Sequence, residues 1–390
     1  MTATKIASFQ PPRRVLMGPG PSDVPQRILD AMARPTIGHL DPRFVDLMEE
    51  IKTMLRYAFQ TENALTFPVS APGSAGMEMC FVNLVEPGDT VIVCVNGVFG
   101  GRMLENVKRS GGVPVAVEDA WGAPVSPAKV EAAFAAHPDA KLLAFVHAET
   151  STGAQSDAAE LGRIAQRHGA LTLMDCVTSL GGTPVRIDAW GIDAAYSGSQ
   201  KCLSCTPGLS PVTFSDRAVA RIKARRTPVQ SWFLDLTLVL GYWQSAGKRT
   251  YHHTAPVNPM YGLHEALVML CEEGLEQAWQ RHARNHERLR AGLEALGLGF
   301  VVAPAHRLPQ LNAVSLPEGV DDAAVRSRLL EEFNLEIGAG LGALAGKVWR
   351  IGLMGCASRA ENVDFCVHAL GKLLPARRSA APDHATARSA

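Results

Sequence analysis

The sequence predicts an α/β protein with a mostly parallel central sheet flanked by helices and a smaller α/β domain near the C-terminal end. Short apolar runs alternate with longer amphipathic stretches from about residue 60. Because parallel strands need long crossover connections, this alternation is typical of a parallel sheet covered on both faces. The length of 390 residues favours one large and one smaller domain over a single core.

Each element of the large domain is predicted from its hydrophobic pattern. Buried strands are expected at Thr90–Val95, Val113–Val117, Lys141–His147, Leu171–Asp175 and Ile192–Ser197. The helices between them are expected at Ser74–Leu84, Gly101–Ser110, Pro127–His137 and Ala158–His168.

The ends of the chain and the small domain follow from other signals. Prolines within residues 1–19 exclude regular helix and predict an extended arm. We expect the large domain over residues 20–273 and the small domain over 274–376, linked by one long amphipathic stretch, Met260–Leu296. The small domain should contain, in order, strand, helix, strand and helix near Asn312–Ser315, Asp322–Phe333, Lys347–Leu353 and Ala360–Leu374. Residues 377–390, rich in Ala, Ser and Arg, are expected to be disordered.

The composition indicates where the protein works and with what. Lys plus Arg and Asp plus Glu both total 38, so no net charge favours a nucleic acid or a membrane as partner. The first 20 residues lack the apolar run of a signal peptide, and no stretch is apolar enough to cross a bilayer. Eight scattered cysteines in a chain of this size favour free thiols and a cytoplasmic location. Cys202 and Cys205 lack a second pair, so we expect no metal site.

Lys201 is the first candidate for chemistry. It follows the expected strand Ile192–Ser197, and ligands of an open parallel sheet gather at the carboxyl ends of the strands. Small residues before it leave its side chain open to a cleft. A lysine desolvated there can lose its proton and attack an aldehyde. Taken alone, it could equally be a solvated surface lysine.

Asp175 ends the apolar strand Leu171–Asp175, where a buried carboxylate needs a cationic partner. A protonated pyridine nitrogen would be such a partner, and the carboxylate would keep the ring an effective electron sink. A turn or helix-capping aspartate fits the same position. The 26 positions from Asp175 to Lys201 (201 − 175) leave room for one further strand, so both can reach one crevice.

Other residues could complete a cofactor and substrate site. The turn Ala71–Gly76 opens a helix whose free amides suit a phosphate, although a plain helix start fits as well. Phe99, between glycines beyond a strand, could stack on a flat ring or pack in the core. Thr150 offers a hydroxyl after another strand. Arg350 is a lone charge in an apolar strand, suited to a substrate carboxylate or to a structural ion pair.

In this order and spacing, the motifs resemble those of the class V, fold type I aminotransferases that use pyridoxal 5'-phosphate (PLP), and within them the alanine–glyoxylate and serine–glyoxylate aminotransferases. The resemblance spans residues 17 to 355. Its specific parts are His147-Ala-Glu-Thr-Ser-Thr-Gly153, Asp175 with Ser179-Leu-Gly-Gly182, Tyr196-Ser-Gly-Ser-Gln-Lys201, and Tyr251-His-His-Thr254.

The resemblance implies a role for each matching residue. Lys201 would hold PLP as a Schiff base and move the α-proton, and Asp175 would pair with the pyridine nitrogen. Arg350 would bind the substrate carboxylate. Further cofactor contacts are implied for Gly73, Ser74, Phe99, Thr150, Val177 and Gln200. Tyr251 and Thr254 would reach the phosphate of the neighbouring subunit, which implies a homodimer with shared sites.

The implied reaction is a ping-pong transamination between a small amino acid, alanine or serine, and glyoxylate or pyruvate. Pro72 stands where close relatives carry a hydroxyl residue, and Phe99 where the nearest often carry Trp, so cofactor affinity is open. Other donors of the family, aminoethylphosphonate or pyridoxamine, are alternatives. A cysteine desulfurase is disfavoured because 336–350 contains no Cys, and a non-catalytic binding protein because Lys201, Asp175 and Arg350 are all present.

Overall fold

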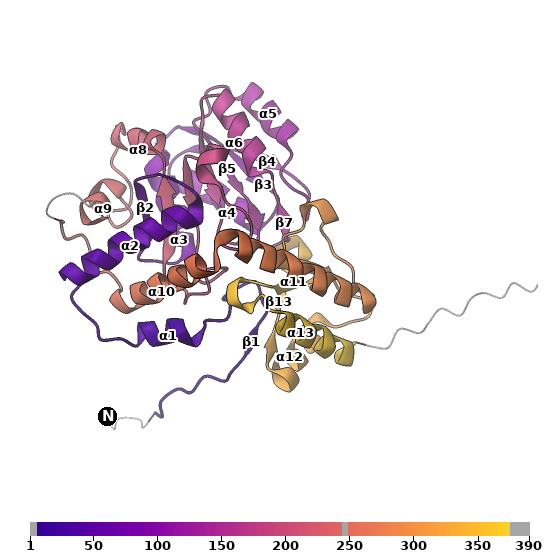
Figure 1. The fold of residues 1–390 in the computed structure, drawn as a ribbon. Coiled ribbons are helices and arrows are strands. Elements are labelled where there is room, and N and C mark those ends of the chain that lie inside the picture. The colour runs from indigo at the N-terminus through magenta and orange to yellow at the C-terminus, as the bar shows by residue number, and fades with distance from the viewer. Residues whose placement is uncertain (1–5, 244–248, 375–390) are drawn as a thin grey trace, which may run out of the picture.

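The computed structural model describes residues 6–243 and 249–374, so the predicted disordered tail 377–390 lies outside the described residues. Two large hydrophobic cores form among these residues, with a small third cluster of five buried side chains. The larger collects buried side chains between Ile28 and Ala278. The smaller joins Met17 to side chains between Leu289 and Leu370. The change from one core to the other falls within α11 (Leu275–Ala295), which Figure 1 shows running between the large sheet and the small-domain helices.

The larger core is built on a seven-stranded sheet with the order β2-β10-β9-β8-β5-β3-β4. Its strands are β2 (Leu65–Val69), β3 (Thr90–Val95), β4 (Val113–Glu118), β5 (Leu142–Val146), β8 (Leu171–Asp175), β9 (Ala194–Tyr196) and β10 (Ser210–Phe214). Five of them, β4, β3, β5, β8 and β9, run parallel, and β10 is antiparallel to both of its neighbours. The predicted mostly parallel sheet is therefore confirmed, and each strand expected from the hydrophobic pattern is present.

Two strands, β2 and β10, were absent from the sequence prediction, and proline explains why. Pro68 interrupts β2 and Pro211 interrupts β10, and the two prolines lie opposite each other in the antiparallel register. Proline cannot donate to a ladder, so a run that contains it scores poorly as a strand. All five residues of each strand are nevertheless buried.

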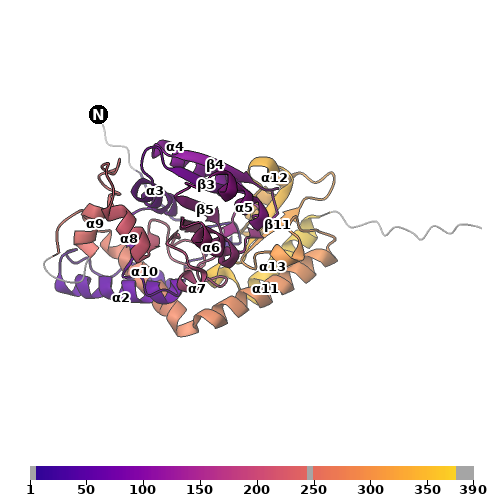
Figure 2. The same cartoon turned by 90° about the horizontal axis from the view of Figure 1, so that it is seen from above.

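Helices cover both faces of the sheet, as Figure 2 shows, with α3 and α4 on one side and α2, α10 and α11 on the other. The covering helices are α1 (Gln26–Met32), α2 (Pro42–Phe59), α3 (Gly73–Leu84), α4 (Val98–Arg109), α5 (Pro127–Ala136), α6 (Ala158–Arg167), α7 (Ile187–Trp190), α8 (Asp216–Lys223), α9 (Leu236–Trp243) and α10 (Val257–Glu273). The expected single stretch Met260–Leu296 is two helices, α10 and α11. They part at Gly274, whose φ of +84° ends the first helix, because only glycine adopts that region easily.

The small domain contains the predicted strand–helix–strand–helix order with additions. The strands β11 (Leu311–Ser315), β14 (Val348–Gly352) and β13 (Gly338–Ala339) form an antiparallel sheet in that order, covered by α12 (Asp322–Phe333) and α13 (Ala360–Leu373). The end of the predicted arm packs against the small domain. Val15–Leu16 (β1) pairs in parallel with Leu335–Glu336 (β12), and Met17 is buried in the small core.

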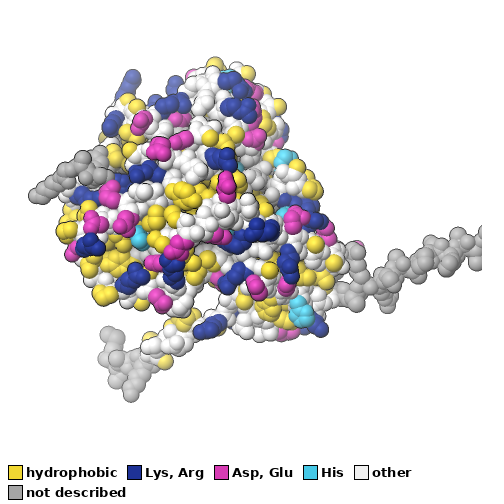
Figure 3. All heavy atoms as spheres, viewed as in Figure 1, with side chains coloured by type: hydrophobic (Ala, Val, Ile, Leu, Met, Phe, Trp, Pro, Cys, Tyr) yellow, Lys and Arg dark blue, Asp and Glu magenta, His cyan; other side chains and the backbone are white. Residues whose placement is uncertain are grey.

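The surface mixes both signs of charge. On the face in Figure 3, basic and acidic side chains lie interspersed, and the N-terminal segment stands away from the body. No helix among residues 6–243 and 249–374 has the length and apolarity needed to span a membrane.

Candidate active site

The predicted catalytic residues meet at the carboxyl-terminal edge of the parallel strands. Asp175 is the last residue of β8, and Lys201 follows β9 by a short loop. Thr150 follows β5, and Phe99 follows β3. Because parallel strands end at the same edge, four segments distant in the sequence converge there.

Asp175 is buried, with 3% of its surface exposed. Its Oδ1 accepts a hydrogen bond from the backbone amide of Val177 at 2.8 Å, so the turn interpretation is correct for that oxygen. Its Oδ2 accepts from the hydroxyl of Tyr196 at 2.7 Å. Burial raises the pKa of Asp175 to about 7. Within the described residues no cation forms an ion pair with it, so a cationic ligand would stabilise its charged form.

Tyr196 was missed by the sequence reasoning. It ends β9 beside β8, opposite Asp175 in the parallel register, and is fully buried. An aromatic residue at a strand end was a usable signal, because a buried phenol needs a hydrogen-bond partner and a neighbouring strand supplies one.

Lys201 is 9% exposed, and its Nζ donates a hydrogen bond to the backbone carbonyl of Pro19. Burial, and after it the charge of Arg350, lower the pKa of Lys201 to about 8. A neutral, nucleophilic amine is therefore accessible near neutral pH. Gly20, the residue after Pro19, leaves room for the Lys201 side chain because it has none of its own. A Cβ at this position, where φ is +109°, would lie 2.6 Å from Nζ. The arm residues thus form one wall around the lysine.

Arg350, on β14, brings the small domain to the same place. Its Nε donates to the carbonyl of Ala339 at 2.7 Å, and its Nη1 donates to the carbonyl of Thr150 at 3.2 Å. It is 7% exposed, and burial lowers its pKa to about 10. Within the described chain no carboxylate forms an ion pair with it. The structural ion pair weighed as the alternative is therefore not formed, and the guanidinium keeps donors for an anion.

Glu149, also missed, is a second buried carboxylate of the site. Its Oε1 accepts from the backbone amide and the hydroxyl of Ser151, at 3.0 and 2.6 Å. Burial raises the pKa of Glu149, and the hydroxyl and amide of Ser151, followed by the amides of Phe99 and Gly100, oppose that rise. A Cβ on Gly97 would lie 2.4 Å from this carboxyl group. Glu149 therefore fixes the turn that carries Phe99.

The Phe99 ring is partly exposed, whereas the Thr150 hydroxyl already has a hydrogen-bond partner. Helix α4 begins at Val98, earlier than expected, so Phe99 lies in its first turn with the guanidinium of Arg102 4.9 Å from its ring centroid. Phe99 is half-buried and still able to stack on a ligand. The hydroxyl of Thr150 is hydrogen-bonded to that of Thr178.

The predicted phosphate turn opens α3. Pro72 precedes the helix and gives no side-chain cap, so the first amides are uncapped. A Cβ on Gly73 would lie 3.3 Å from the carbonyl of Ser197 and 3.5 Å from Val177, so the turn adjoins the loop before Lys201. Oε1 of Gln200 is buried and lacks a hydrogen-bond partner within the described residues. Ser74 is exposed.

Two predicted residues do not join this cluster in the single chain. Tyr251 is 66% exposed, with its ring centroid 5.6 Å from that of His39, and Thr254 is exposed. No hydrogen bond within the described part of the chain joins either residue to Lys201 or Asp175.

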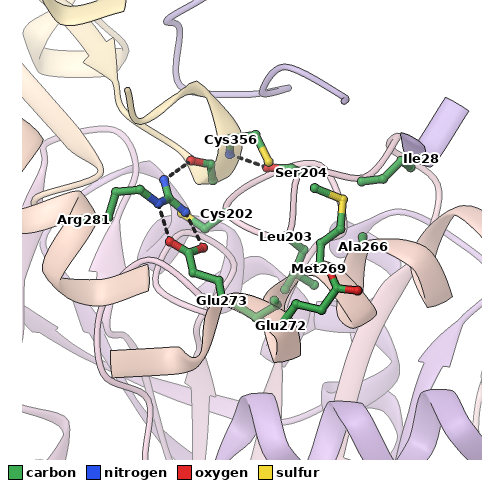
Figure 4. Close-up of a pocket in the computed structure, with 13 residues that line it drawn as sticks. Ile28, Cys202, Leu203, Ser204, Ala266, Met269, Glu272, Glu273, Arg281 and Cys356 are labelled. Carbon is green, nitrogen blue, oxygen red and sulfur yellow. Dashed lines mark hydrogen bonds and ion pairs between the residues drawn. The ribbon is translucent and has the colours of Figure 1, made fainter. Parts of the chain in front are cut away.

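A separate cavity of about 330 Å³ is lined in part by residues 202–204, which directly follow Lys201 and are called the lysine loop here (Figure 4). Cys202, Ser204 and Cys356 line it, whereas Lys201 does not. The hydroxyl of Ser204 accepts from the amide of Cys356 at 2.7 Å, and Arg281 donates to the carbonyl of Gly355 at 2.7 Å. The first of these bonds attaches the lysine loop to the small domain, and the second attaches α11 to the same segment. Cys356 lines this cavity, which Lys201 does not, and this agrees with the sequence evidence against a cysteine desulfurase.

The arrangement fits PLP. A desolvated amine, a buried carboxylate that pairs with no cation among the described residues, and an uncapped helix start lie around one edge of a parallel sheet. Together they match what a pyridinium aldehyde with a phosphate group requires. The fold and the site therefore define a PLP enzyme of fold type I.

The comparisons identify the family. The model of the class-V aminotransferase family matches residues 14–365, and the chain belongs to this family of PLP-dependent aminotransferases. It is 42% identical to an alanine–glyoxylate aminotransferase of Oryctolagus cuniculus, covering 93% of each chain. The crystal structure of an alanine–glyoxylate aminotransferase from Nostoc sp. has a TM-score of 0.93 at 48% identity, covering 95% of this chain and 98% of that one. A ureidoglycine–glyoxylate aminotransferase from Bacillus subtilis has a TM-score of 0.92 at 36% identity, covering 94% of each chain.

Proposed function

We propose that this aminotransferase transfers the amino group of a small amino acid, alanine or serine, to glyoxylate, with pyruvate as a second acceptor. The observation that carries the proposal is Arg350, a buried guanidinium without a carboxylate partner among the described residues, beside Lys201. Both substrates of such a reaction carry a carboxylate that its planar fork can bind. The relatives described above share glyoxylate in their names while their donors differ, which favours glyoxylate as the acceptor.

Each residue has a defined task in this proposal. Bound PLP supplies an electron sink for the α-carbon. Lys201 carries the cofactor and, once displaced by substrate, moves the α-proton, for which its lowered pKa suits it. Asp175 keeps the pyridine nitrogen protonated, and Tyr196 holds Asp175 in place. Val177, beside Gly73, and Phe99 would contact the two faces of the ring, and Thr150 its oxygen. The first turn of α3, with Gly73, Ser74 and Gln200, would bind the phosphate.

The substrate proposal is tested by a panel of amino donors against glyoxylate and pyruvate, with the amino acid product quantified by mass spectrometry. We expect alanine or serine with glyoxylate to give the highest kcat/KM, with glycine as product. If no donor yields glycine, while aminoethylphosphonate or pyridoxamine aminates pyruvate, the donor and acceptor proposed here are wrong and the alternative reading holds.

We also propose a homodimer in which Tyr251 and Thr254 reach the phosphate of the partner subunit. Large exposed apolar side chains support an interface: Ile6 is 87%, Phe9 83%, Trp232 64% and Tyr251 66% exposed in the single chain. Light scattering should give about twice the chain mass of 41.7 kDa.

We further propose a cytoplasmic location. The eight free cysteines support it, and cell fractionation would test it.

A further inference from the structure

Three side chains, Ser70, His253 and His252, are joined in a hydrogen-bonded row that starts just before the phosphate turn. Ser70 directly precedes the turn, and its Oγ lies 2.7 Å from Nε2 of His253. Nδ1 of His253 lies 2.8 Å from Nδ1 of His252. His252 is 6% exposed and stacks on Trp232 with ring centroids 4.6 Å apart. Its Nε2 is buried without a hydrogen-bond partner within the described residues.

The geometry of this row restricts where its protons can be. Two nitrogens 2.8 Å apart share one hydrogen, because two N–H groups would clash and two lone pairs would repel. Burial lowers the pKa of His253 to about 4, so this ring is neutral at pH 7 and carries one proton. If that proton is on Nε2, His253 donates to Ser70. If it is on Nδ1, Ser70 must donate to His253.

The two states leave Ser70 with different capacities. A hydroxyl has one hydrogen. When His253 donates to Ser70, the hydroxyl hydrogen is free to point toward an acceptor at the turn. When Ser70 donates to His253, its hydrogen is used. A phosphate bound at the start of α3 accepts hydrogen bonds only, so it selects the first state. His252 then donates from Nδ1, and its Nε2 is an acceptor.

We propose that His253, oriented by His252, is a positioning residue for the cofactor phosphate: it holds the Ser70 hydroxyl as a donor toward the phosphate turn. The inference rests on the phosphate position proposed above. In this arrangement the Ser70 hydroxyl provides the side-chain donor that Pro72 lacks. The same two histidines lie between Tyr251 and Thr254 in the sequence, so they join each chain's own phosphate turn to the segment proposed to serve the partner's phosphate.

The experiment compares affinity for PLP with affinity for pyridoxal, which lacks the phosphate, in the apo form of the full chain. The variants are His253→Leu, which removes the donor, His253→Gln, whose amide can restore it, and Ser70→Ala. His264→Leu is the matched control, since His264 pairs with Glu50 on α2 through Nε2 at 2.6 Å, outside this row of side chains.

We expect His253→Leu and Ser70→Ala each to weaken PLP binding about tenfold, the loss of one hydrogen bond to a charged group, and to leave pyridoxal binding unchanged. His253→Gln should recover most of the loss, and the double variant His253→Leu/Ser70→Ala should bind PLP no more weakly than either single variant. The inference is overturned if His253→Leu weakens both ligands equally, as a structural role would, or weakens neither.

A further variant separates failure of this inference from failure of the phosphate position. Gly73→Val adds a branched side chain where a Cβ already lies 3.3 Å from the carbonyl of Ser197. If this variant loses PLP selectively while His253→Leu does not, the phosphate position stands and only the histidine inference fails. If neither variant discriminates PLP from pyridoxal, the phosphate lies elsewhere and both fail.

Discussion

At the scale of single residues, burial sets the protonation of the groups on which the site depends. Burial raises the pKa of Asp175 to about 7 and lowers that of Lys201 to about 8, so both titrate near neutrality without ligand. A pyridinium beside Asp175 would stabilise its buried charge, and a covalent link at Lys201 would remove the cost of burying a charged amine. The empty protein should therefore be less stable than its loaded form.

The first prediction concerns Asp175→Asn in the apo protein. Because the folded pKa of about 7 lies above the ordinary aspartate value of 3.8, the stability that the protonated carboxyl contributes is present below about pH 4 and is lost as pH rises through 7. Asparagine carries no charge, so the variant should unfold at a higher temperature than wild type at pH 8, on the order of 2 °C or more, with a smaller gap at pH 5. Calorimetry at both values checks this. An equal gap at both pH values would contradict the assigned pKa.

The second prediction concerns Arg350. Arg350→Ala should raise KM for carboxylate substrates at least about tenfold and change kcat less, because a charge-assisted contact made in ground and transition states alike is lost. Arg328→Ala is the control, since Arg328 forms only an exposed i,i+4 pair with Glu332. A large fall in kcat at unchanged KM would assign Arg350 to the chemical step instead.

At the scale of elements, close packing of α3 fixes the start of the phosphate turn. A Cβ on Gly76 would lie 2.0 Å from Oγ of Ser210 on β10 and 3.4 Å from Cβ of Tyr196 on β9. The helix therefore lies directly on the strand that ends at the partner of Asp175. The glycine that permits this was not singled out by the sequence pattern, because the need for it comes from a strand more than a hundred residues away.

The third prediction compares two helical glycines. Gly76→Ala should destabilise the protein by about 1–3 kcal/mol through overpacking. Gly101→Ala, on α4 with nothing within 4 Å of its Cβ position, should be neutral or stabilise by about 0.5–1 kcal/mol because alanine favours helix. Urea unfolding measures both. Equal effects of the two substitutions would mean that α3 does not pack on β10 as closely as described.

The elements show what a sequence can and cannot predict. The parallel strands and their helices follow from periodicity, and the ends of those strands place Lys201 and Asp175 in one crevice. The antiparallel pair β2 and β10 could not be predicted, because Pro68 and Pro211 mask it. Glu149 and Gly20 could not be assigned either, because their roles come from contacts with distant segments, whereas the position of Tyr196 at a strand end was a usable signal.

At the scale of the whole molecule, two domains share one site. Arg350 of the small sheet donates to Thr150 of the large domain, and Lys201 donates to Pro19 of the N-terminal segment. Tyr251 and Thr254 are exposed and do not join the cluster in their own chain, so we propose that they contact a second chain.

The fourth prediction tests that sharing. Lys201→Ala and the double variant Tyr251→Ala/Thr254→Ala should each have little activity. Mixing them under exchange conditions should form hybrid dimers in which one site keeps all three residues, so activity should return to part of the wild-type value. If the mixture gives only the sum of the separate activities although exchange is demonstrated by mass, the shared-site proposal is wrong.

The central claim is that Lys201 carries the cofactor, and peptide mapping tests it most directly. Borohydride reduction of the PLP-loaded protein fixes the link between lysine and cofactor, and proteolysis with mass spectrometry then locates it. We expect the modification on Lys201, with none in Lys201→Ala. Modification of a different lysine in the wild-type protein would show that Lys201 does not carry the cofactor.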